Sequence, residues 1–259
     1  MVEQVTFLNT RFDRMSSQEA VELLVSRLLK QQGGCVYFAN AHTMVMASKN
    51  PALTEVLEHS DLLLSDGSGV RLGSALLGTP LVHNLNGTDL VPALCKAGAT
   101  KGLSVYLLGS KPGVAEEAAA KLTKAYPGLV IAGTQHGYFS QQKTEQVLES
   151  IRAARPHLLL VAMGVPLQEI WINQYASQLP GITCMGVGGL FYFVAERVVR
   201  APYLFRAVGI EWLWRLAMEP TRLWRRYIIG NFVFLALVAT HAIALRQSAQ
   251  LRTQNLPGN

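Results

Sequence analysis

The feature that most constrains the fold is a series of short, unbroken apolar runs that alternate with helical stretches. Residues 158–161, for example, read Leu-Leu-Leu-Val. Such runs are typical of strands that are covered on both faces, as in a parallel sheet. We expect strands at residues 36–39, 62–64, 104–108, 129–132, 158–162 and 182–187. The alternation predicts an α/β fold: a Rossmann-like parallel sheet with helices on both faces.

Three helix starts are marked by residues that satisfy free backbone amides. Ser16 and Glu19 have the spacing of a capping box. Asn40 directly follows an apolar run, where its side chain is suited to cap the next helix. Asn50 and Pro51 place a capping residue before a proline at the first helical position.

Most of the positive charge lies in one segment near the C-terminus. Residues 197–226 contain seven arginines and two glutamates, and contribute +5 of the formal net charge of +6. Residues 227–245 contain no charged residue. We therefore expect an α/β domain at residues 1–196 and an Arg-rich, apolar appendage that associates with a membrane at residues 197–259.

The uncharged segment would be about 28 Å long as a helix, which is borderline for a membrane span. Asn231, Thr240 and His241 interrupt it, and a mostly polar tail, residues 246–259, follows. We favour a helix embedded in one leaflet or packed at the interface over a true span. Burial within the protein or within an oligomer is the third alternative.

Membrane contact is expected from the cytoplasmic side. The N-terminus shows no basic segment followed by an apolar one, so we expect no secretory signal. Arg222, Arg225 and Arg226 precede the uncharged segment and match the excess of positive charge at cytoplasmic ends of membrane segments. We expect a peripheral or monotopic protein, with membrane lipid as a partner.

Three other classes of function have little support in the sequence. Tryptophans lie among the arginines, a mixture as typical of membrane interfaces as of nucleic-acid grooves, and no nucleic-acid-binding motif accompanies them. The three cysteines lack the spacing of a metal site or a disulfide framework, which fits a reducing cytosol. No strand leads into the Gly-x-Gly-x-x-Gly turn of a dinucleotide-binding redox enzyme. We expect no nucleic acid partner, no metal and no cofactor.

Four loops that are rich in glycine or polar residues are expected at one edge of the sheet. Ligands of open parallel sheets bind at the carboxyl ends of the strands, where helix N-termini offer backbone amides to phosphate. The loops are Asp66-Gly67-Ser68-Gly69, Gly109-Ser110-Lys111-Pro112-Gly113, Gly164-Val165-Pro166-Leu167-Gln168-Glu169 and Gly186-Val187-Gly188-Gly189. Each alone is a weak signal, but four on one edge indicate a binding site.

Asp66 is the strongest candidate for a catalytic group. It directly follows an apolar strand, so its carboxylate is expected to face the cleft and to act as a general base. The alternative is that Asp66 caps the next helix. Asp89 has a similar ambiguity, because it lies in the first turn of a helix that we expect Thr88 to cap. His42, near a strand end, either lines the site or is structural.

The four aspartates of the chain form no Asp-x-Asp pair, the motif with which many transferases hold a divalent ion on a nucleotide diphosphate. If a diphosphate binds, arginines and helix N-termini must supply the positive charge. Arg215, Arg222, Arg225 and Arg226 are available for this role. Attachment to anionic lipid is their alternative role, and the two are compatible.

The chain resembles the WecG/TagA/CpsF glycosyltransferases, or glycosyltransferase family 26, over residues 36–227. The resemblance rests on a long series of motifs in the same order along the chain. They are Asn40-Ala41-His42, Ser65-Asp66-Gly67-Ser68-Gly69, Asn86-Gly87-Thr88-Asp89-Leu90, Leu108-Gly109-Ser110, Gly137-Tyr138-Phe139, Pro166-Leu167-Gln168-Glu169-Ile170-Trp171, Gly186-Val187-Gly188-Gly189, Arg200-Ala201-Pro202, Glu211-Trp212, Arg215, Glu219-Pro220 and Arg222-Leu223-Trp224-Arg225-Arg226-Tyr227.

The resemblance implies transfer of a sugar from a UDP-sugar to a polyprenyl-diphosphate-linked saccharide, with inversion and without metal, in bacterial surface or exopolysaccharide synthesis. It implies that Asp66 is the general base and that the protein works at the cytoplasmic face of the inner membrane. It also implies a set of residues that bind the nucleotide sugar. These are Asn40, Gly109, Ser110, Gly164, Gln168, Glu169, Gly188, Arg215, Arg222 and Arg225.

The sequence departs from the family pattern at four positions. Phe38 stands in place of a threonine, and Leu167 in place of a lysine. Tyr192 follows Phe191 where the family has an aspartate, and Glu196 replaces a glycine. These departures bear on the identity of the donor more than on the class of reaction. The alternative function is a non-catalytic or divergent membrane-associated scaffold of a polysaccharide assembly complex, and self-association into a homo-oligomer is compatible with the sequence.

Overall fold

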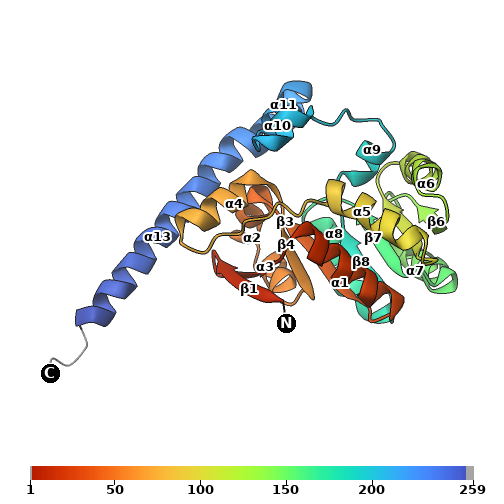
Figure 1. The fold of residues 1–259 in the computed structure, drawn as a ribbon, viewed down its shortest axis with the longest axis horizontal. Coiled ribbons are helices and arrows are strands. Elements are labelled where there is room, and N and C mark those ends of the chain that lie inside the picture. Colours follow the sequence, from red (N-terminus) through yellow and green to blue (C-terminus); the bar gives the residue numbers. More distant parts are fainter. Residues whose placement is uncertain (1, 255–259) are drawn as a thin grey trace.

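The computed structural model of the chain describes residues 2–254 (Figure 1). Its centre is a six-stranded sheet with the order β4-β3-β8-β7-β5-β6, in which every neighbouring pair is parallel. The strands, with the N-terminal pair β1 and β2, are β1 Glu3–Phe7, β2 Thr10–Arg14, β3 Gly34–Ala39, β4 Leu62–Ser65, β5 Ser104–Gly109, β6 Val130–Gln135, β7 Leu158–Ala162 and β8 Thr183–Gly186. The predicted parallel α/β fold is confirmed.

Helices connect the strands and form the C-terminal segment. Their bounds are α1 Ser17–Leu29, α2 Ala41–Ala47, α3 Pro51–Glu58, α4 Gly67–Leu76, α5 Gly87–Ala99, α6 Val114–Ala125, α7 Thr144–Ala154, α8 Leu167–Tyr175, α9 Leu190–Val194, α10 Tyr203–Ala207, α11 Glu211–Met218, α12 Pro220–Trp224 and α13 Gly230–Gln254. Short 3-10 turns lie at Gln141–Lys143 and Ala176–Gln178, and a π-helical turn at Arg225–Ile229 joins α12 to α13.

The helices cover both faces of the sheet because the strands are apolar on both sides. Along β5, Val105 and Leu107 belong to a core shared with α1, α5, α6 and α9. Tyr106 and Leu108, which point to the other face, belong to a second core shared with α2, α3, α7 and α8. This double coverage explains why the strands are unbroken apolar runs in the sequence.

The predicted helix starts are confirmed at Ser16, Asn40 and Asn50. Ser16 and Glu19 form the capping box, and the side chains of Asn40 and Asn50 accept hydrogen bonds from Thr43 N and Leu53 N. The cap predicted for α5 is wrong. Asn86, rather than Thr88, occupies that position, because its Oδ1 accepts hydrogen bonds from both the Asp89 amide at 2.9 Å and the Thr88 hydroxyl at 2.6 Å.

The N-terminal hairpin is an element that the sequence analysis did not predict. Strand β1 pairs antiparallel with β2 through a two-residue turn at Leu8 and Asn9, which have φ values of 49° and 62°. Two-residue hairpin turns of this kind favour Asn-Gly or Asp-Gly, and that signal is absent here. Asp13 on β2 is buried and accepts a hydrogen bond from Leu63 N on β4 at 2.8 Å, which ties the hairpin to the sheet.

The C-terminal helix is continuous from Pro220 to Ser248 and is about 44 Å long. Among the described residues it is the one helix that is long and apolar enough, by length and composition, to cross a membrane. It runs along the body of the protein and projects beyond it (Figure 1). The helix continues to Gln254 through most of the predicted polar tail, and residues 255–259 lie outside the described residues.

One face of this helix is buried against the α/β domain. Phe234 and Val238 are buried and join the second core, and the Phe234 ring lies 6.1 Å from the Phe7 ring. A Cβ atom at Gly73 on α4 would lie 2.9 Å from Phe7 and 3.1 Å from Phe234, so only glycine allows this close approach. Burial within the protein, the third alternative for the apolar segment, therefore holds for one of its faces.

Candidate active site

Most of the candidate site residues lie along the carboxyl edge of the sheet. In strand order, Asp66 follows β4, Asn40 follows β3, Gly188 lies just after β8, Gly164 just after β7, and Gly109 ends β5. Neighbouring strands are about 4.8 Å apart, so Asp66 and Gly109, four strands apart, are separated by roughly 19 Å along the edge. The predicted residues thus define an elongated site rather than a compact pocket.

Asp66 is oriented by Asn40. Asn40 Nδ2 donates a hydrogen bond to Asp66 Oδ2 at 3.0 Å. The opposite atom of the same amide, Asn40 Oδ1, accepts from Thr43 N at 3.1 Å and caps α2. Because the cap requires the oxygen, the nitrogen is directed towards the carboxylate. One side chain therefore starts a helix and fixes the position of the candidate base.

Asp66 occupies the N-cap position of α4, but its side chain makes no capping hydrogen bond. The Gly67 amide, at the start of α4, donates instead to Asn84 Oδ1 at 2.7 Å. Asp66 itself is half-buried. Its carboxylate is bonded to Asn40 rather than used as a helix cap, which is the arrangement expected of a functional group at this edge.

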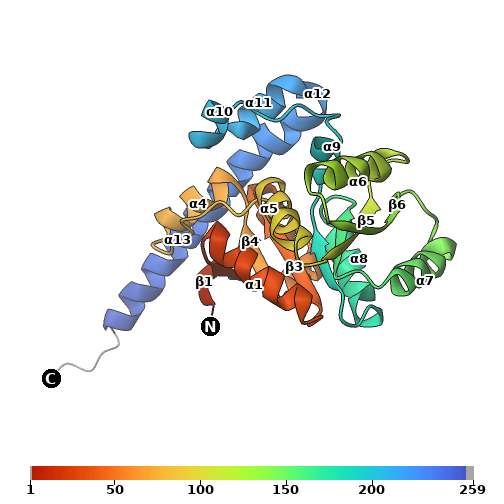
Figure 2. The same ribbon diagram turned by 45° about the vertical axis from the view of Figure 1, so that its right-hand side comes forward.

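The C-terminal segment folds over the part of the edge that carries Asp66. Helices α10 to α12 lie above this end of the domain (Figure 2). The Ser68 hydroxyl, two residues after Asp66, donates to the Gly209 carbonyl at 2.6 Å. Burial raises the pKa of Glu211, and the charges of Asp66 and Asp89 act in the same direction while Arg200 and Arg215 oppose it. Glu211 is therefore close to the candidate base and to two arginines.

Arg215 and Arg226 are the arginines that the segment directs towards the site. The Arg215 guanidinium lies over the Phe193 ring, with its Cζ atom 5.1 Å from the centroid. Burial lowers the pKa of Arg226, and the charges of Arg215 and Arg222 add to this while Asp66 opposes it. The Nε atoms of Arg215 and Arg226 are buried without a hydrogen-bond partner among the described residues. These two side chains therefore retain donors for an anion.

Arg222 and Arg225 have different surroundings. Arg222 forms an ion pair with Glu219 at 2.6 Å, and the Arg225 guanidinium lies 5.4 Å from the Trp224 ring. Both arginines are exposed, whereas Arg215 and Arg226 are half-buried. The structure thus divides the predicted arginine cluster into an inner pair and an outer pair.

Asp89 belongs to a small network that links α5 to the C-terminal segment. Its Oδ1 accepts from Arg200 Nη2 at 2.7 Å, and its Oδ2 accepts from Asn86 Nδ2 at 2.8 Å. Burial alone would raise the pKa of Asp89, but these two hydrogen bonds lower it below its usual value. Asp89 is therefore held as a carboxylate that positions Arg200.

Gln168 joins the loops that follow β7 and β8. Its Oε1 accepts from Gly164 N at 3.1 Å and from Gly188 N at 2.9 Å, and its Nε2 donates to Glu169 Oε1 at 2.8 Å. Gln168 and Glu169 are both buried. Burial raises the pKa of Glu169 to about 7, despite the hydrogen bond from Gln168. Both side chains lie beneath the surface of the site and shape its floor.

The loop after β5 is packed tightly against its neighbours. Ser110 N donates to the Ala162 carbonyl at 2.8 Å, and Gly137 N donates to the Ser110 carbonyl at 2.9 Å. Gly109 has a φ of 129°, and a Cβ there would lie 2.4 Å from Ala162 O. The Ser110 hydroxyl is buried without a hydrogen-bond partner among the described residues, and so retains a donor at the far end of the site.

His42 lies on the first turn of α2, in the neighbourhood of Arg226. Burial lowers the pKa of His42 to about 4, and the positive charge of Arg226 contributes. The imidazole is therefore neutral near pH 7. Within residues 2–254, no three His, Cys, Asp or Glu side chains come together as a group that could hold a metal ion.

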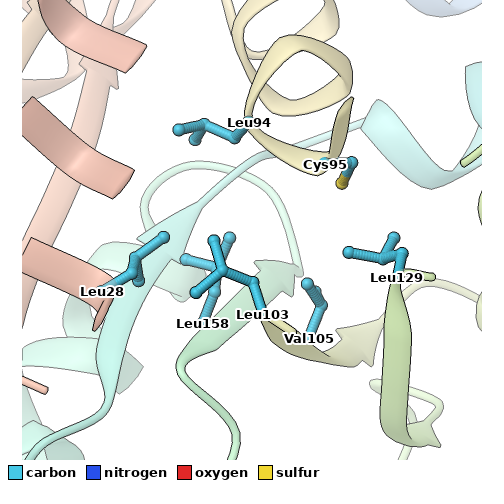
Figure 3. Close-up of a pocket in the computed structure, with 7 residues that line it drawn as sticks. All are labelled: Leu28, Leu94, Cys95, Leu103, Val105, Leu129 and Leu158. Atoms are coloured by element: carbon cyan, nitrogen blue, oxygen red, sulfur yellow. The ribbon is translucent and has the colours of Figure 1, made fainter. Parts of the chain in front are cut away.

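A small void in the apolar core is not part of this site. It is lined by Leu28, Leu94, Cys95, Leu103, Val105, Leu129 and Leu158 (Figure 3). Its volume is about 10 Å³, which at most matches one water molecule, and its lining offers no polar partners. Leu103, Leu129 and Leu158 lie at the amino ends of β5, β6 and β7, opposite the edge that carries Asp66.

Arg200 and Glu211 are site residues that the sequence analysis did not select, and it named Arg226 only as one member of the arginine cluster. Their signal was present, because all three lie in the Arg-rich segment or its matched motifs. However, periodicity and spacing do not reveal which arginine of a cluster faces inward. That depends on how α11 and α12 are oriented over the sheet.

Comparison with known proteins identifies relatives along nearly the whole chain. The family model described as the glycosyl transferase WecG/TagA/CpsF family matches residues 5–248. A protein of Bacillus spizizenii (strain ATCC 23059 / NRRL B-14472 / W23) is 32% identical over 244 residues, which cover 94% of this chain and 92% of the relative. A protein of Staphylococcus aureus (strain MW2) is 30% identical over 233 residues, 89% of this chain and 91% of the relative. Both are named N-acetylglucosaminyldiphosphoundecaprenol N-acetyl-beta-D-mannosaminyltransferase.

Proposed function

The chain belongs to the WecG/TagA/CpsF family of glycosyl transferases, and from this premise we propose that it moves a sugar from a UDP-sugar to a polyprenyl-diphosphate-linked saccharide, with inversion at the anomeric carbon. The names of the two relatives support a lipid-linked N-acetylglucosamine as the acceptor. The product would serve bacterial surface or exopolysaccharide synthesis at the cytoplasmic face of the inner membrane.

The observation that carries this proposal is the environment of Asp66. Asp66 directly follows a buried strand, and its carboxylate accepts a hydrogen bond from Asn40 and makes no capping hydrogen bond. In the proposed reaction the acceptor hydroxyl oxygen attacks the anomeric carbon, and Asp66 takes the hydroxyl proton as the new bond forms. The bond between the anomeric carbon and the diphosphate oxygen breaks, and UDP leaves with the electron pair.

The departing diphosphate needs positive charge, which the inner pair of arginines would supply. Arg215 lies over Phe193 of α9, which follows β8 in the middle of the sheet edge, and so stands between Asp66 and the loop after β5. The charge of Asp66 influences the pKa of Arg226, whose buried Nε donor has no hydrogen-bond partner among the described residues. Guanidinium groups directed to the leaving oxygens stabilise the charge that develops in the transition state. Arg222 and Arg225 would strengthen this field from outside.

The remaining candidate residues would line the bottom of the binding site for the UDP-sugar donor. Gln168 holds the Gly164 and Gly188 loops together, while Gly109 and Ser110 form the far end of the edge. We assign residues 1–196 to catalysis and residues 197–259 to membrane binding and closure of the site. The exposed face of the helix Pro220–Ser248 supports this division.

The test is UDP release by the full chain in detergent micelles, with a panel of UDP-sugars, polyprenyl-diphosphate-N-acetylglucosamine as acceptor, and EDTA present. Wild type and Asp66→Asn are compared. We expect acceptor-dependent release with one donor, and a loss of at least about a hundredfold in kcat for Asp66→Asn, within the range that general bases contribute. Full activity of the variant would exclude Asp66 as the base. No release with any donor would favour the scaffold alternative.

A further inference from the structure

A groove on the protein surface lies beside the candidate active site and has no role in the mechanism above. It has a volume of about 420 Å³, within the range of about 300–1,000 Å³ that is usual for ligand pockets. Its apolar lining comes from α5, from α9 and from the segment that leads to α10. The apolar lining residues are Pro92, Leu190, Phe193, Val194, Val198 and Val199. Thr88, Arg200 and Glu196 also line the groove, and the Glu196 carboxylate is paired with Lys121 Nζ at 2.5 Å. We call this surface feature the α5–α9 groove.

The groove also has a cationic side chain with an unused donor. Arg200 lines it and is held by Asp89 at 2.7 Å, with Thr88 Oγ1 at 3.4 Å, while its buried Nε has no partner among the described residues. Phe193, another lining residue, lies under the guanidinium of Arg215. Two arginines therefore border the groove, and both lie near Glu211, whose pKa is also influenced by Asp66.

The chain segment that lines the groove leads into a helix with exposed apolar side chains. Val199 lines the groove and is 62% exposed. Just after it in the chain, α10 and the residue that follows it expose Tyr203, Leu204 and Val208 by 68–74%. Such a run of exposed apolar side chains is unusual on a surface that faces only water and marks contact with a membrane or a partner.

The groove thus combines apolar walls and a neighbouring exposed apolar segment with two arginines near the residues around Asp66. A lipid-linked acceptor combines matching chemistries: an isoprenoid chain, an anionic diphosphate, and the sugar that carries the attacking hydroxyl. We propose that the α5–α9 groove binds the isoprenoid units next to the diphosphate, with Arg200 beside the diphosphate. This inference rests on the proposed function, because it takes a lipid-linked saccharide as the acceptor.

The groove lies at the margin of the proposed donor site. Its Leu190 comes two residues after Gly188, which lies in the loop that follows β8, whereas its Pro92 comes from α5. Burying the first isoprenoid units would withdraw them from the bilayer, and the apolar walls compensate for that transfer. Binding of the lipid would also place the acceptor diphosphate beside Arg200.

The experiment is photo-crosslinking of the full chain in detergent micelles. The probe is N-acetylglucosamine diphosphate linked to a farnesyl-length chain that carries a benzophenone, and labelled peptides are mapped by mass spectrometry. We expect labels on residues 190–200 and on the start of α5, and competition by farnesyl diphosphate but not by phosphatidylglycerol. Val199→Glu should reduce labelling at least about tenfold, because a charge in the apolar groove opposes binding of the chain. Val82→Glu is the matched control, since Val82 is also exposed, by 55%, and does not line the groove.

The outcomes separate this inference from the proposed function. Labelling confined to α13, labelling that phosphatidylglycerol displaces, no labelling, or equal labelling of both variants would overturn the groove assignment, even if the enzyme is active. Labelling of the groove without sugar transfer from any donor would support the groove and refute the proposed reaction. In the active enzyme, Val199→Glu should raise the KM for the long-chain acceptor by about tenfold and leave the KM for the UDP-sugar unchanged.

Discussion

The side-chain amide of Asn40 donates a 3.0 Å hydrogen bond to the carboxylate of Asp66, across two neighbouring parallel strands. The same amide caps α2 through its oxygen. The pairing register places Ala39 of β3 opposite Ser65 of β4, so the residues that follow them, Asn40 and Asp66, lie next to each other at the sheet edge. The orientation of the candidate base is therefore built into the start of a helix.

Replacing Asn40 by aspartate should impair catalysis without unfolding the protein. The new carboxylate keeps an oxygen to cap α2, but it places a second negative charge against Asp66. We expect kcat to fall by about tenfold to a hundredfold and the acidic limb of the kcat/KM profile to move to higher pH, because two adjacent carboxylates do not both ionise readily. Asn50→Asp, the same change at the cap of α3, is the control. Superimposable pH profiles for the two variants would contradict a positioning role for Asn40.

Neutralising Arg226 should separate its role at the site from attraction to lipid. Arg226→Gln removes a half-buried charge near Asp66, whereas Arg246→Gln removes an exposed charge from the same C-terminal helix. We expect kcat to fall by about tenfold to a thousandfold for Arg226→Gln and to stay near wild type for Arg246→Gln, in line with the loss of one leaving-group donor. Steady-state UDP release measures both. Equal loss of activity and of liposome binding in the two variants would instead assign Arg226 to lipid attachment.

Substitutions of two phenylalanines in α13 should separate membrane binding from protein stability. Phe232 is 72% exposed, whereas Phe234, two residues later, is 3% exposed and packs on Phe7. Phe232→Asp should weaken co-flotation with liposomes and leave the Tm unchanged. Phe234→Ala should lower the free energy of unfolding by about 3 kcal/mol, as expected for a large-to-small change in a core. If Phe232→Asp floats as well as wild type, the exposed face of α13 is not a membrane contact.

Because of Glu169, the free energy of unfolding should decrease as pH rises from about 4.5 to about 7. Burial raises its pKa to about 7 in the folded state, against 4.5 for the ordinary group. Between these values the folded protein binds a proton that the unfolded chain does not, so the free energy of unfolding decreases as pH rises towards about 7 and then levels off. The total effect is at most about 3 kcal/mol.

Thermal unfolding from pH 5 to pH 8 measures this effect. Wild type should lose Tm relative to Glu169→Gln across that window, because glutamine has no proton to release. Glu149→Gln, at an exposed position on α7, should follow wild type throughout. A Tm difference between wild type and Glu169→Gln that does not change with pH would show that Glu169 is already ionised in the folded protein at pH 5.

Local features of the fold were predictable from the sequence. The runs at residues 62–64 and 158–162 are strands because apolar side chains on both faces have no other stable placement. Ser16, Asn40 and Asn50 mark helix starts because their side chains satisfy amides within three residues. These features are predictable because all the residues that determine them lie within a short stretch of the chain.

Features that depend on distant segments were not predictable in the same way. The β1–β2 hairpin has a turn of Leu8 and Asn9 without glycine, and its position is fixed by a contact between Asp13 and Leu63. The split between inner and outer arginines follows from the orientation of α11 and α12. The bridging role of Gln168 depends on Gly164 and Gly188, which lie on separate loops. The periodicity of the sequence does not predict these contacts between residues that are far apart in the chain.

The loop amides described above have a consequence for product release. The amides of Gly67, Ser110, Gly164 and Gly188 already donate to oxygens of the protein itself. These four amides are therefore not free to bind a phosphate group. In the proposed reaction, the guanidinium groups of the C-terminal segment would then supply much of the electrostatic hold on the product nucleotide. If the proposed UDP-sugar is the donor, withdrawal of that segment would remove these guanidinium groups from UDP, so product release would be coupled to opening of the segment.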